Sequence, residues 1–291
     1  ETEIEFLKNR VSAFGKIGFD GMCMATSTYM DLAKSLGKRM LVSDVDYIGD
    51  IWENRPELPK EAAYEYPVEF SGKSVSEKLE IIRYMMKDRH ADYTFIGALE
   101  DVCYLYNIRG WDVDCTPVVL SYALISQDEA YLFIDMDKVT PEIEEPLRKA
   151  GVQILPYGEE KEKLSEIPGQ KIVYLEPDRV NIYLYHQLNN NVKIHHGINF
   201  TSLMKAIKND VEIENEKKAY IKDGVALVKF FYWVETGAGT GTITEQVAVE
   251  KLHRFREELP DFIEDSFDAI IGYGANAAIV HHNPMTSKTP T

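Results

Sequence analysis

The sequence predicts an α/β protein with two α/β units and a third region in which helices dominate. Two observations predict this class. Up to residue 197, short apolar segments of strand length alternate with amphipathic segments of helical length, which is typical of α/β folds. After residue 198 helical periodicity takes over, and we expect a separate domain there that is cut short at residue 291.

We expect the first α/β unit to lack its beginning, since the first residue is Glu1 and not methionine. Thr26 is placed to cap a helix, and Gly37 is placed to end it. The β-α-β order predicts a parallel sheet. The elements predicted in this unit are a helix over residues 1–14, a strand over 16–20, a helix over 26–36 and a strand over 38–45.

The second unit follows a proline-rich stretch at residues 53–70, which we interpret as a linker because its three prolines interrupt regular structure. Ser74 or Ser76 is expected to cap the first helix of the unit. Three asparagines at residues 189–191 mark its end. The elements predicted here are helices over residues 74–88, 99–106, 140–150 and 180–188, and strands over 91–96, 118–125, 129–134, 152–155 and 171–175.

In the third region the spacing predicts helices over residues 200–207, 210–232 and 244–259. The glycine-rich stretch at residues 237–241 is interpreted as a helix connector, because a phosphate-binding loop would carry a lysine and follow a strand. Near the end of the chain, the small apolar run at residues 277–280 predicts a short buried strand that Pro284 stops.

The charge and cysteine content limit the classes of function. A formal net charge of −16 argues against non-specific binding of nucleic acid or anionic membranes, both of which require basic surface. No apolar run approaches the ~18 residues of a membrane span. The three cysteines have no CxxC spacing, so we expect reduced thiols and a cytoplasmic protein.

His281 and His282 directly follow the predicted strand at residues 277–280, which would hold an imidazole rigidly. One interpretation is a group that faces substrate or transfers a proton. The other is a histidine at a strand end that is satisfied by a carbonyl. His195 and His196 also form a pair, but no Asp, Glu or Cys lies at ligand spacing nearby, so we expect a solvated turn there.

Arg109 lies in the turn NIRGWD at residues 107–112. An arginine on such a turn can bind a carboxylate through two parallel hydrogen bonds. The alternative is an ion pair with Asp112 or Asp114. The residues alone leave both interpretations open.

Seven stretches, taken in order along the chain, together resemble one family, the three-domain Xaa-Pro aminopeptidases (aminopeptidase P) of the creatinase-like, "pita-bread" metallopeptidases. They include NIRGWDV followed by PVVLSYAL, and SFDAIIGYGANAAIVH at residues 266–281; the stretches are specific together, and any one alone would be weak. The seven stretches are residues 51–59, 72–79, 105–113, 117–124, 205–214, 219–226 and 266–281.

The resemblance implies an enzyme that hydrolyses the bond between an N-terminal residue and proline, using two divalent metal ions, usually manganese. It further implies short peptides with proline at the second position as substrates, and a homodimer. His281 matches the family histidine that contacts the substrate or stabilises the tetrahedral intermediate. We therefore expect His281 to be catalytic and substrate-binding, and Arg109 to be a substrate-binding residue.

The resemblance also implies a domain plan and a missing part. We expect residues 1–55 to be the second half of a creatinase N-terminal-like (ribonuclease H-like) α/β domain, 56–73 a linker, 74–197 a second such domain, and 198–291 the incomplete start of an α+β pita-bread catalytic domain. The family's five metal ligands (two Asp, one His and two Glu) would follow residue 291. We therefore expect no catalytic metal and no peptidase activity in this polypeptide by itself. His282 stands where the family usually has Tyr or Phe.

The alternative hypothesis for the function of the whole protein is a non-catalytic pita-bread module that binds peptides or proteins.

Overall fold

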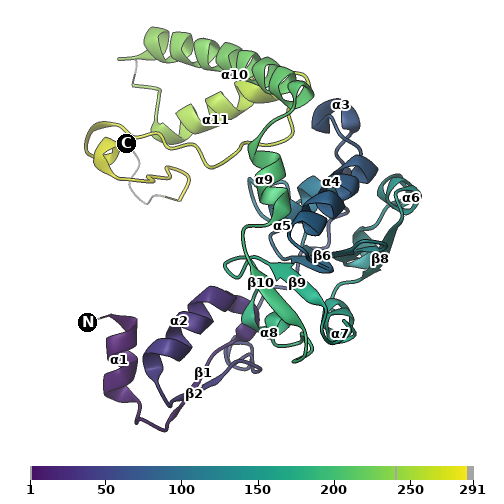
Figure 1. Ribbon diagram of the computed structural model, residues 1–291. Coiled ribbons are helices and arrows are strands. Elements are labelled where there is room, and N and C mark those ends of the chain that lie inside the picture. Colours follow the sequence, from purple (N-terminus) through teal and green to yellow (C-terminus); the bar gives the residue numbers. More distant parts are fainter. Residues whose placement is uncertain (1, 240, 287–291) are drawn as a thin grey trace. The chain divides into compact units, whose positions relative to one another are not determined.

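The computed structural model describes residues 2–239 and 241–286, which form two compact units. Within these residues, unit 1 comprises residues 2–112 and 118–208, and unit 2 comprises residues 113–117, 209–239 and 241–286. Figure 1 shows sheets and helices in unit 1 and two packed helices in unit 2. The predicted α/β class is confirmed. The domain boundaries at residues 55, 73 and 197 stay a prediction.

The first 50 residues of unit 1 form a small parallel β-α-β arrangement, as predicted. Strand β1 pairs in parallel with β2, and α2 lies between them in sequence. Thr26 does not cap α2: its Oγ1 donates to the backbone oxygen of Val180 at 2.8 Å, and Ala25 occupies the N-cap. The hydroxyl of Thr26 thus bonds to a residue far along the chain and does not cap its own helix. The elements are α1 (Glu3–Arg10), β1 (Lys16–Gly18), the 3-10 turn η1 (Gly21–Cys23), α2 (Thr26–Leu36) and β2 (Met40–Val42).

The centre of unit 1 is a six-stranded mixed sheet with the strand order β10-β9-β4-β6-β7-β8. Only β6 runs antiparallel to its neighbours, β4 and β7; the other neighbouring strands are parallel. Every residue of β6 and β7 is buried, because helices cover both faces of the sheet. The strands are β4 (Tyr93–Ile96), β6 (Ser121–Ser126), β7 (Ala130–Ile134), β8 (Val152–Pro156), β9 (Ile172–Leu175) and β10 (Lys193–His196).

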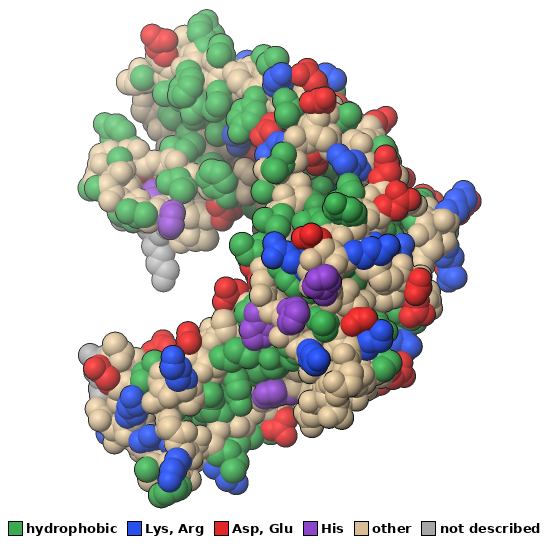
Figure 2. All heavy atoms as spheres, viewed as in Figure 1, with side chains coloured by type: hydrophobic (Ala, Val, Ile, Leu, Met, Phe, Trp, Pro, Cys, Tyr) green, Lys and Arg blue, Asp and Glu red, His purple; other side chains and the backbone are tan. Residues whose placement is uncertain are grey.

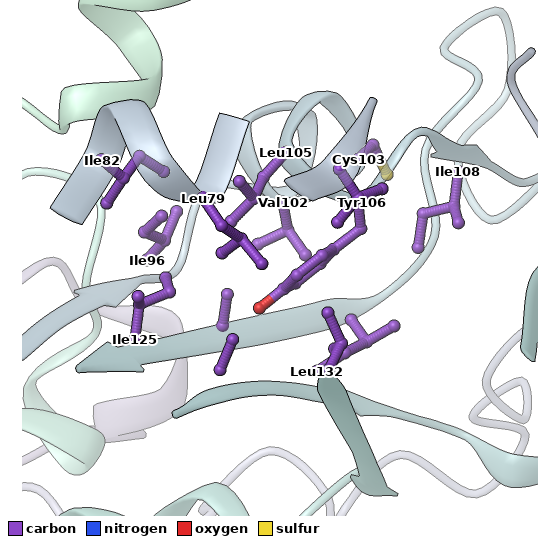
Figure 3. Close-up of a cluster of buried hydrophobic side chains, with 14 of the residues drawn as sticks. Leu79, Ile82, Ile96, Val102, Cys103, Leu105, Tyr106, Ile108, Ile125 and Leu132 are labelled. Carbon is purple, nitrogen blue, oxygen red and sulfur yellow. The ribbon is translucent and has the colours of Figure 1, made fainter. Parts of the chain in front are cut away.

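Alternate strand residues enter two apolar layers. On one face Ile96, Ile125 and Leu132 pack against helices α4 and α5, as Figure 3 shows. On the other face Phe95 and Phe133 pack against α7 and α8. Ser74 caps α4 through a reciprocal bond with Glu77, which confirms the first of the two predicted capping serines. The helices are α4 (Val75–Asp88), α5 (Leu99–Tyr106), η2 (Met136–Lys138), α6 (Pro141–Lys149), α7 (Glu160–Ser165), α8 (Ile182–Tyr185) and α9 (Phe200–Ala206).

The structure corrects three sequence expectations in unit 1. His195 and His196 lie in strand β10, paired with β9, and not in a solvated turn. The turn NIRGWD contains a short strand, β5 (Ile108–Arg109), which pairs antiparallel with β3 (Tyr64–Glu65). The proline-rich stretch is therefore partly ordered: it also holds α3 (Val68–Ser71), and Ala63 is buried in the core. These elements are too short to give a periodic signal, and they form through pairing with residues far along the chain.

Unit 2 is built on two packed helices, α10 (Asp210–Gly237) and α11 (Glu245–Glu257). Asn209 and Thr244 cap them, and the apolar contact between them centres on Phe230, Ala248 and Leu252. Figure 2 shows many exposed hydrophobic side chains over the long helix α10. No helix in residues 2–239 and 241–286 is long and apolar enough to cross a membrane.

The predicted strand at residues 277–280 is wrong. Residues 274–278 form a 3-10 turn, η3 (Gly274–Ala278), and Val280 is 82% exposed. A strand needs a neighbour for its backbone groups, and the described residues of unit 2 contain no strand that could pair with it. The apolar run by itself does not create that partner.

Candidate functional site

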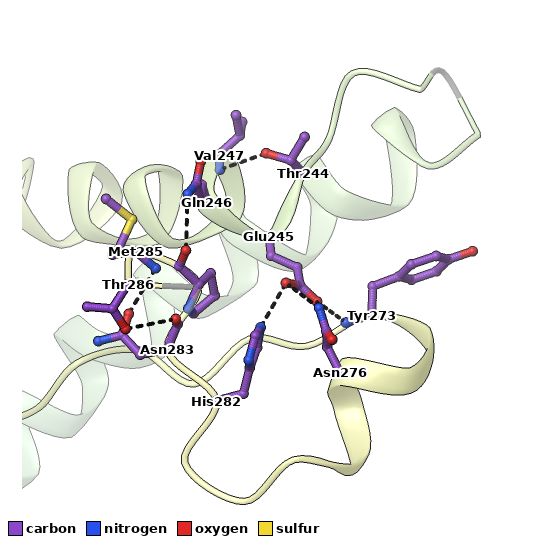
Figure 4. A network of polar contacts seen from close by, with 11 residues as sticks. Thr244, Glu245, Gln246, Val247, Tyr273, Asn276, His282, Asn283, Met285 and Thr286 are labelled. Carbon is purple, nitrogen blue, oxygen red and sulfur yellow. Dashed lines mark hydrogen bonds and ion pairs between the residues drawn. The ribbon is translucent and has the colours of Figure 1, made fainter. Parts of the chain in front are cut away.

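The segment that carries His281 lies beside the first turn of α11, and one carboxylate holds it there. Glu245 is the first residue of α11, and its side chain is 4% exposed. Its Oε1 accepts the backbone N–H of Tyr273 at 2.6 Å, and its Oε2 accepts from His282 Nε2 at 2.8 Å. Asn276 Nδ2 donates to both carboxylate oxygens, at 3.2 and 3.1 Å. Figure 4 shows these contacts converging on Glu245.

His282 and His281 have opposite environments although they are neighbours. His282 is 6% exposed and is fixed by its contact with Glu245. His281 is exposed, and its backbone has a φ of 58°, in the left-handed region that non-glycine residues rarely adopt. The exposed histidine is therefore the one that can meet a ligand, and the buried one anchors the turn.

A further hydrogen bond ties down the end of this segment. Gln246 Nε2 donates to the backbone oxygen of Pro284 at 3.1 Å, and Pro284 is buried. The segment is thus attached to consecutive positions of α11, with Tyr273 and Asn276 bound to Glu245 and Pro284 bound to Gln246. This arrangement presents the imidazole of His281 from a turn and not from a strand.

Arg109 lies in unit 1, in strand β5, and does not form either ion pair considered from the sequence. Its guanidinium stacks over the ring of Tyr66, with the carbon Cζ 4.2 Å from the ring centroid. Its Nη1 donates to the backbone oxygen of Ile108 at 2.9 Å. A guanidinium has five N–H donors, so these contacts hold the side chain in place while leaving its capacity for an anion.

Asp112 from the same turn is occupied by a different cation. Its Oδ2 lies 2.5 Å from Lys138 Nζ and accepts the backbone N–H of Leu120 at 2.6 Å. Both side chains are essentially fully buried, at 0% and 2% exposure. A Cβ on Gly110 would come within 2.9 Å of Val119, so the turn needs glycine there. The turn is thus a rigid platform that presents Arg109.

Two residues of unit 2 were missed from the sequence. Glu245 carried only the signal of an acid in the first turn of a capped helix, which is common and usually structural. His253, also on α11, contacts Asp265 through Nδ1 at 2.6 Å and Glu257 through Nε2 at 3.2 Å. Asp265 comes from a loop twelve residues later, so no local pattern indicates this pairing.

The hydrogen bond from His253 to Asp265 raises the pKa of His253 above its usual range, with a smaller contribution from the charge of Glu257. The protonated form is therefore favoured by folding. The stabilisation should be fully present below about pH 6.5 and should disappear as the pH rises through the higher pKa of the folded state. An NMR titration of the imidazole should show this higher pKa, and Asp265→Asn should lower it. An equal midpoint in the two proteins would contradict the pairing.

The residues that the structure describes do not fit a metal centre. Among residues 2–239 and 241–286, no group of three or more His, Cys, Asp and Glu side chains is placed to hold a metal ion. We therefore derive no catalytic step through a metal from these residues.

Comparison with known proteins gives the family of the chain. Residues 54–212 match the Creatinase/Prolidase N-terminal domain. The chain is 32% identical over 304 aligned residues to Xaa-Pro aminopeptidase 1 of Dictyostelium discoideum, covering 99% of this chain and 48% of that protein. It is 29% identical to Aminopeptidase P1 of Arabidopsis thaliana, covering 92% of this chain and 49% of that protein. The chain therefore spans about half the length of these relatives.

A solved structure agrees with these matches. The X-prolyl aminopeptidase of Caenorhabditis elegans, described as a cytosolic enzyme with a di-nuclear active site, superimposes with a TM-score of 0.84 at 27% identity. The match covers 92% of this chain and 45% of that one. Because the N-terminal domain match alone extends over more than half of its residues, the chain belongs to the creatinase/prolidase family, which has the pita-bread metallopeptidase fold, and the Xaa-Pro aminopeptidases are among its relatives.

Proposed function

We propose that this chain is the N-terminal part of a Xaa-Pro aminopeptidase, an enzyme that releases the residue preceding proline from the N-terminus of a peptide. The observation that carries the proposal is the similarity to Xaa-Pro aminopeptidase 1 of Dictyostelium discoideum along 99% of this chain, at 32% identity. The relatives are about twice as long. We expect the remaining half of the intact protein to supply the metal ligands, so this polypeptide alone should be inactive.

In the intact enzyme, His281 is proposed to donate a hydrogen bond to the carbonyl oxygen of the scissile Xaa-Pro bond as the tetrahedral intermediate forms. Its exposure supports this role, because its ring can reach a ligand while His282 and Glu245 hold the backbone on either side. A preorganised donor aimed at developing negative charge costs little reorganisation during the reaction. Two divalent ions, which we expect to be manganese, would be held by the remaining half of the intact protein and would supply Lewis-acid chemistry there when bound.

Unit 1 is proposed to restrict access to short peptides and to take part in a homodimer. Arg109 supports a substrate-binding role in unit 1, since its guanidinium is stacked on Tyr66 and keeps donors for a peptide carboxylate. We place the intact protein in the cytosol, in agreement with the description of the Caenorhabditis elegans enzyme as cytosolic.

A pair of matched peptides tests the proposed specificity. The intact protein, supplied with manganese, is incubated with an Arg-Pro-Pro peptide and with the same peptide carrying alanine at position two. We expect release of arginine only from the first, measured by mass spectrometry. Equal release from both peptides would contradict proline specificity. Peptide binding without cleavage would instead support a non-catalytic module.

A further inference from the structure

Glu245 makes more contacts with the His281 segment than a helix-capping acid needs. It sits at the first position of α11, but the residue that caps this helix is Thr244, whose side chain accepts from the backbone N–H of Val247. The bonds that Glu245 accepts from Tyr273, Asn276 and His282 join residues 28 to 37 positions apart. The carboxylate is thus bound at three residues of the segment that carries His281.

The three contacted residues enclose the turn that precedes His281. Tyr273 and Asn276 lie at the start of this turn, in and next to η3, and His282 lies at its end. A φ of 58° at His281 persists only where the surroundings hold it, since a free chain would relax to negative φ. Glu245 supplies a contact at the residue that directly follows His281.

We propose that Glu245 is a positioning residue for His281: its buried carboxylate fixes Tyr273, Asn276 and His282, and this fixes the place and direction of the neighbouring exposed imidazole. The role in turnover rests on the proposed peptidase function. Glu245 does not touch substrate, and it acts only through the segment that it holds. Its loss should therefore move His281 without removing any reacting group.

Two substitutions at position 245 should have different effects on the segment that carries His281. Glu245→Gln keeps one oxygen for Tyr273 N–H, while its new NH₂ group faces His282 Nε2. That nitrogen can accept the bond if the imidazole carries its proton on Nδ1 instead. Glu245→Ala leaves three donors without an acceptor. The glutamine variant should thus keep the segment in place, and the alanine variant should not.

The test measures kcat and KM for an Arg-Pro-Pro peptide with the intact protein. Glu245→Ala should lower kcat by about 10- to 100-fold, as expected for a misplaced catalytic group, and leave KM largely unchanged. Glu245→Gln should recover most of this loss. In a His281→Ala background, Glu245→Ala should have almost no further effect, because a residue that acts through another adds nothing once that one is gone. Glu250→Ala, at an exposed position on α11, is the matched control and should behave as wild type.

Two results would overturn the proposal: equal losses from Glu245→Ala with and without His281, or wild-type turnover in Glu245→Ala. Hydrogen exchange separates this proposal from the proposed function. If the intact wild-type protein cleaves no Xaa-Pro peptide, the proposed peptidase function is wrong. The positioning role of Glu245 is then tested by the amide exchange rates of residues 272–283 alone. Those amides should exchange faster in Glu245→Ala than in wild type or Glu245→Gln, while α11 stays protected. Unchanged exchange there would refute positioning whether or not the protein is active.

Discussion

Replacing His281 with alanine in the intact protein should lower kcat for an Xaa-Pro peptide by about 10²- to 10⁴-fold, the range for loss of a proton-transfer or oxyanion-stabilising group. The reason is positional. His281 is exposed at a turn that is fixed on both sides, by Glu245 at Tyr273 and His282 and by Gln246 at Pro284. Steady-state kinetics together with metal analysis should show the loss of turnover at unchanged metal content.

His195→Ala is the matched control for this change. His195 is also exposed, but it lies in the edge strand β10 of unit 1 and has no proposed part in the reaction. Its replacement should leave kcat and KM near the wild-type values. A His281→Ala enzyme with near-native turnover would reduce His281 to a surface residue and would remove the candidate site from this chain.

The second large effect is expected at the base of the NIRGWD turn. Asp112→Ala should lower the free energy of unfolding by about 3–5 kcal/mol, because it leaves the ammonium of Lys138 buried without a counter-ion. The same change removes the acceptor of Leu120 N–H. Urea denaturation gives this difference from the shift in midpoint at constant slope.

Two variants show whether burial is the cause. Glu145→Ala removes the ion pair with Lys149, whose side chains are 70% and 73% exposed, and should cost no more than about 1 kcal/mol. Adding Lys138→Met to Asp112→Ala should recover part of the lost stability, because the unpaired charge is then gone. A cost for Asp112→Ala as small as that for Glu145→Ala would mean that the pair is not held away from water.

Elements with strong local signals were predictable. Helix α5 begins and ends where the spacing of its apolar residues predicts, and α4 is capped by Ser74 as the sequence indicates. The antiparallel contact of β6 with β7 follows from two β-prone runs joined by a tight turn. In these cases the residues that decide the structure are close together in the sequence.

Features that depend on distant partners were not predictable. Strand β10 forms by pairing with β9, and β3 forms by pairing with β5. The strand expected before His281 has no such neighbour among the described residues of unit 2, and the segment forms a 3-10 turn held by side chains. Arg109 illustrates the same point, because the sequence suggested an ion pair with Asp112 or Asp114. In the structure its guanidinium stacks on Tyr66, and Asp112 forms its ion pair with Lys138.

The candidate site was found only in part. The sequence indicated His281, and resemblance to the Xaa-Pro aminopeptidases gave it a role that still awaits a test. Glu245 could not be found, because the contacts with Tyr273 and His282 arise only when the chain folds back on α11. The two adjacent histidines are alike in sequence, and only the structure shows one to be buried and the other exposed.

The most direct test of the central claim is the turnover of an Arg-Pro-Pro peptide by the intact protein before chelation, after chelation and after manganese is returned. We predict release of the N-terminal arginine, loss of that release with the chelator, and recovery with the metal. Failure to release arginine at any metal concentration, by a folded protein of the full length of the matched relatives, would contradict the claim that this chain is part of a Xaa-Pro aminopeptidase.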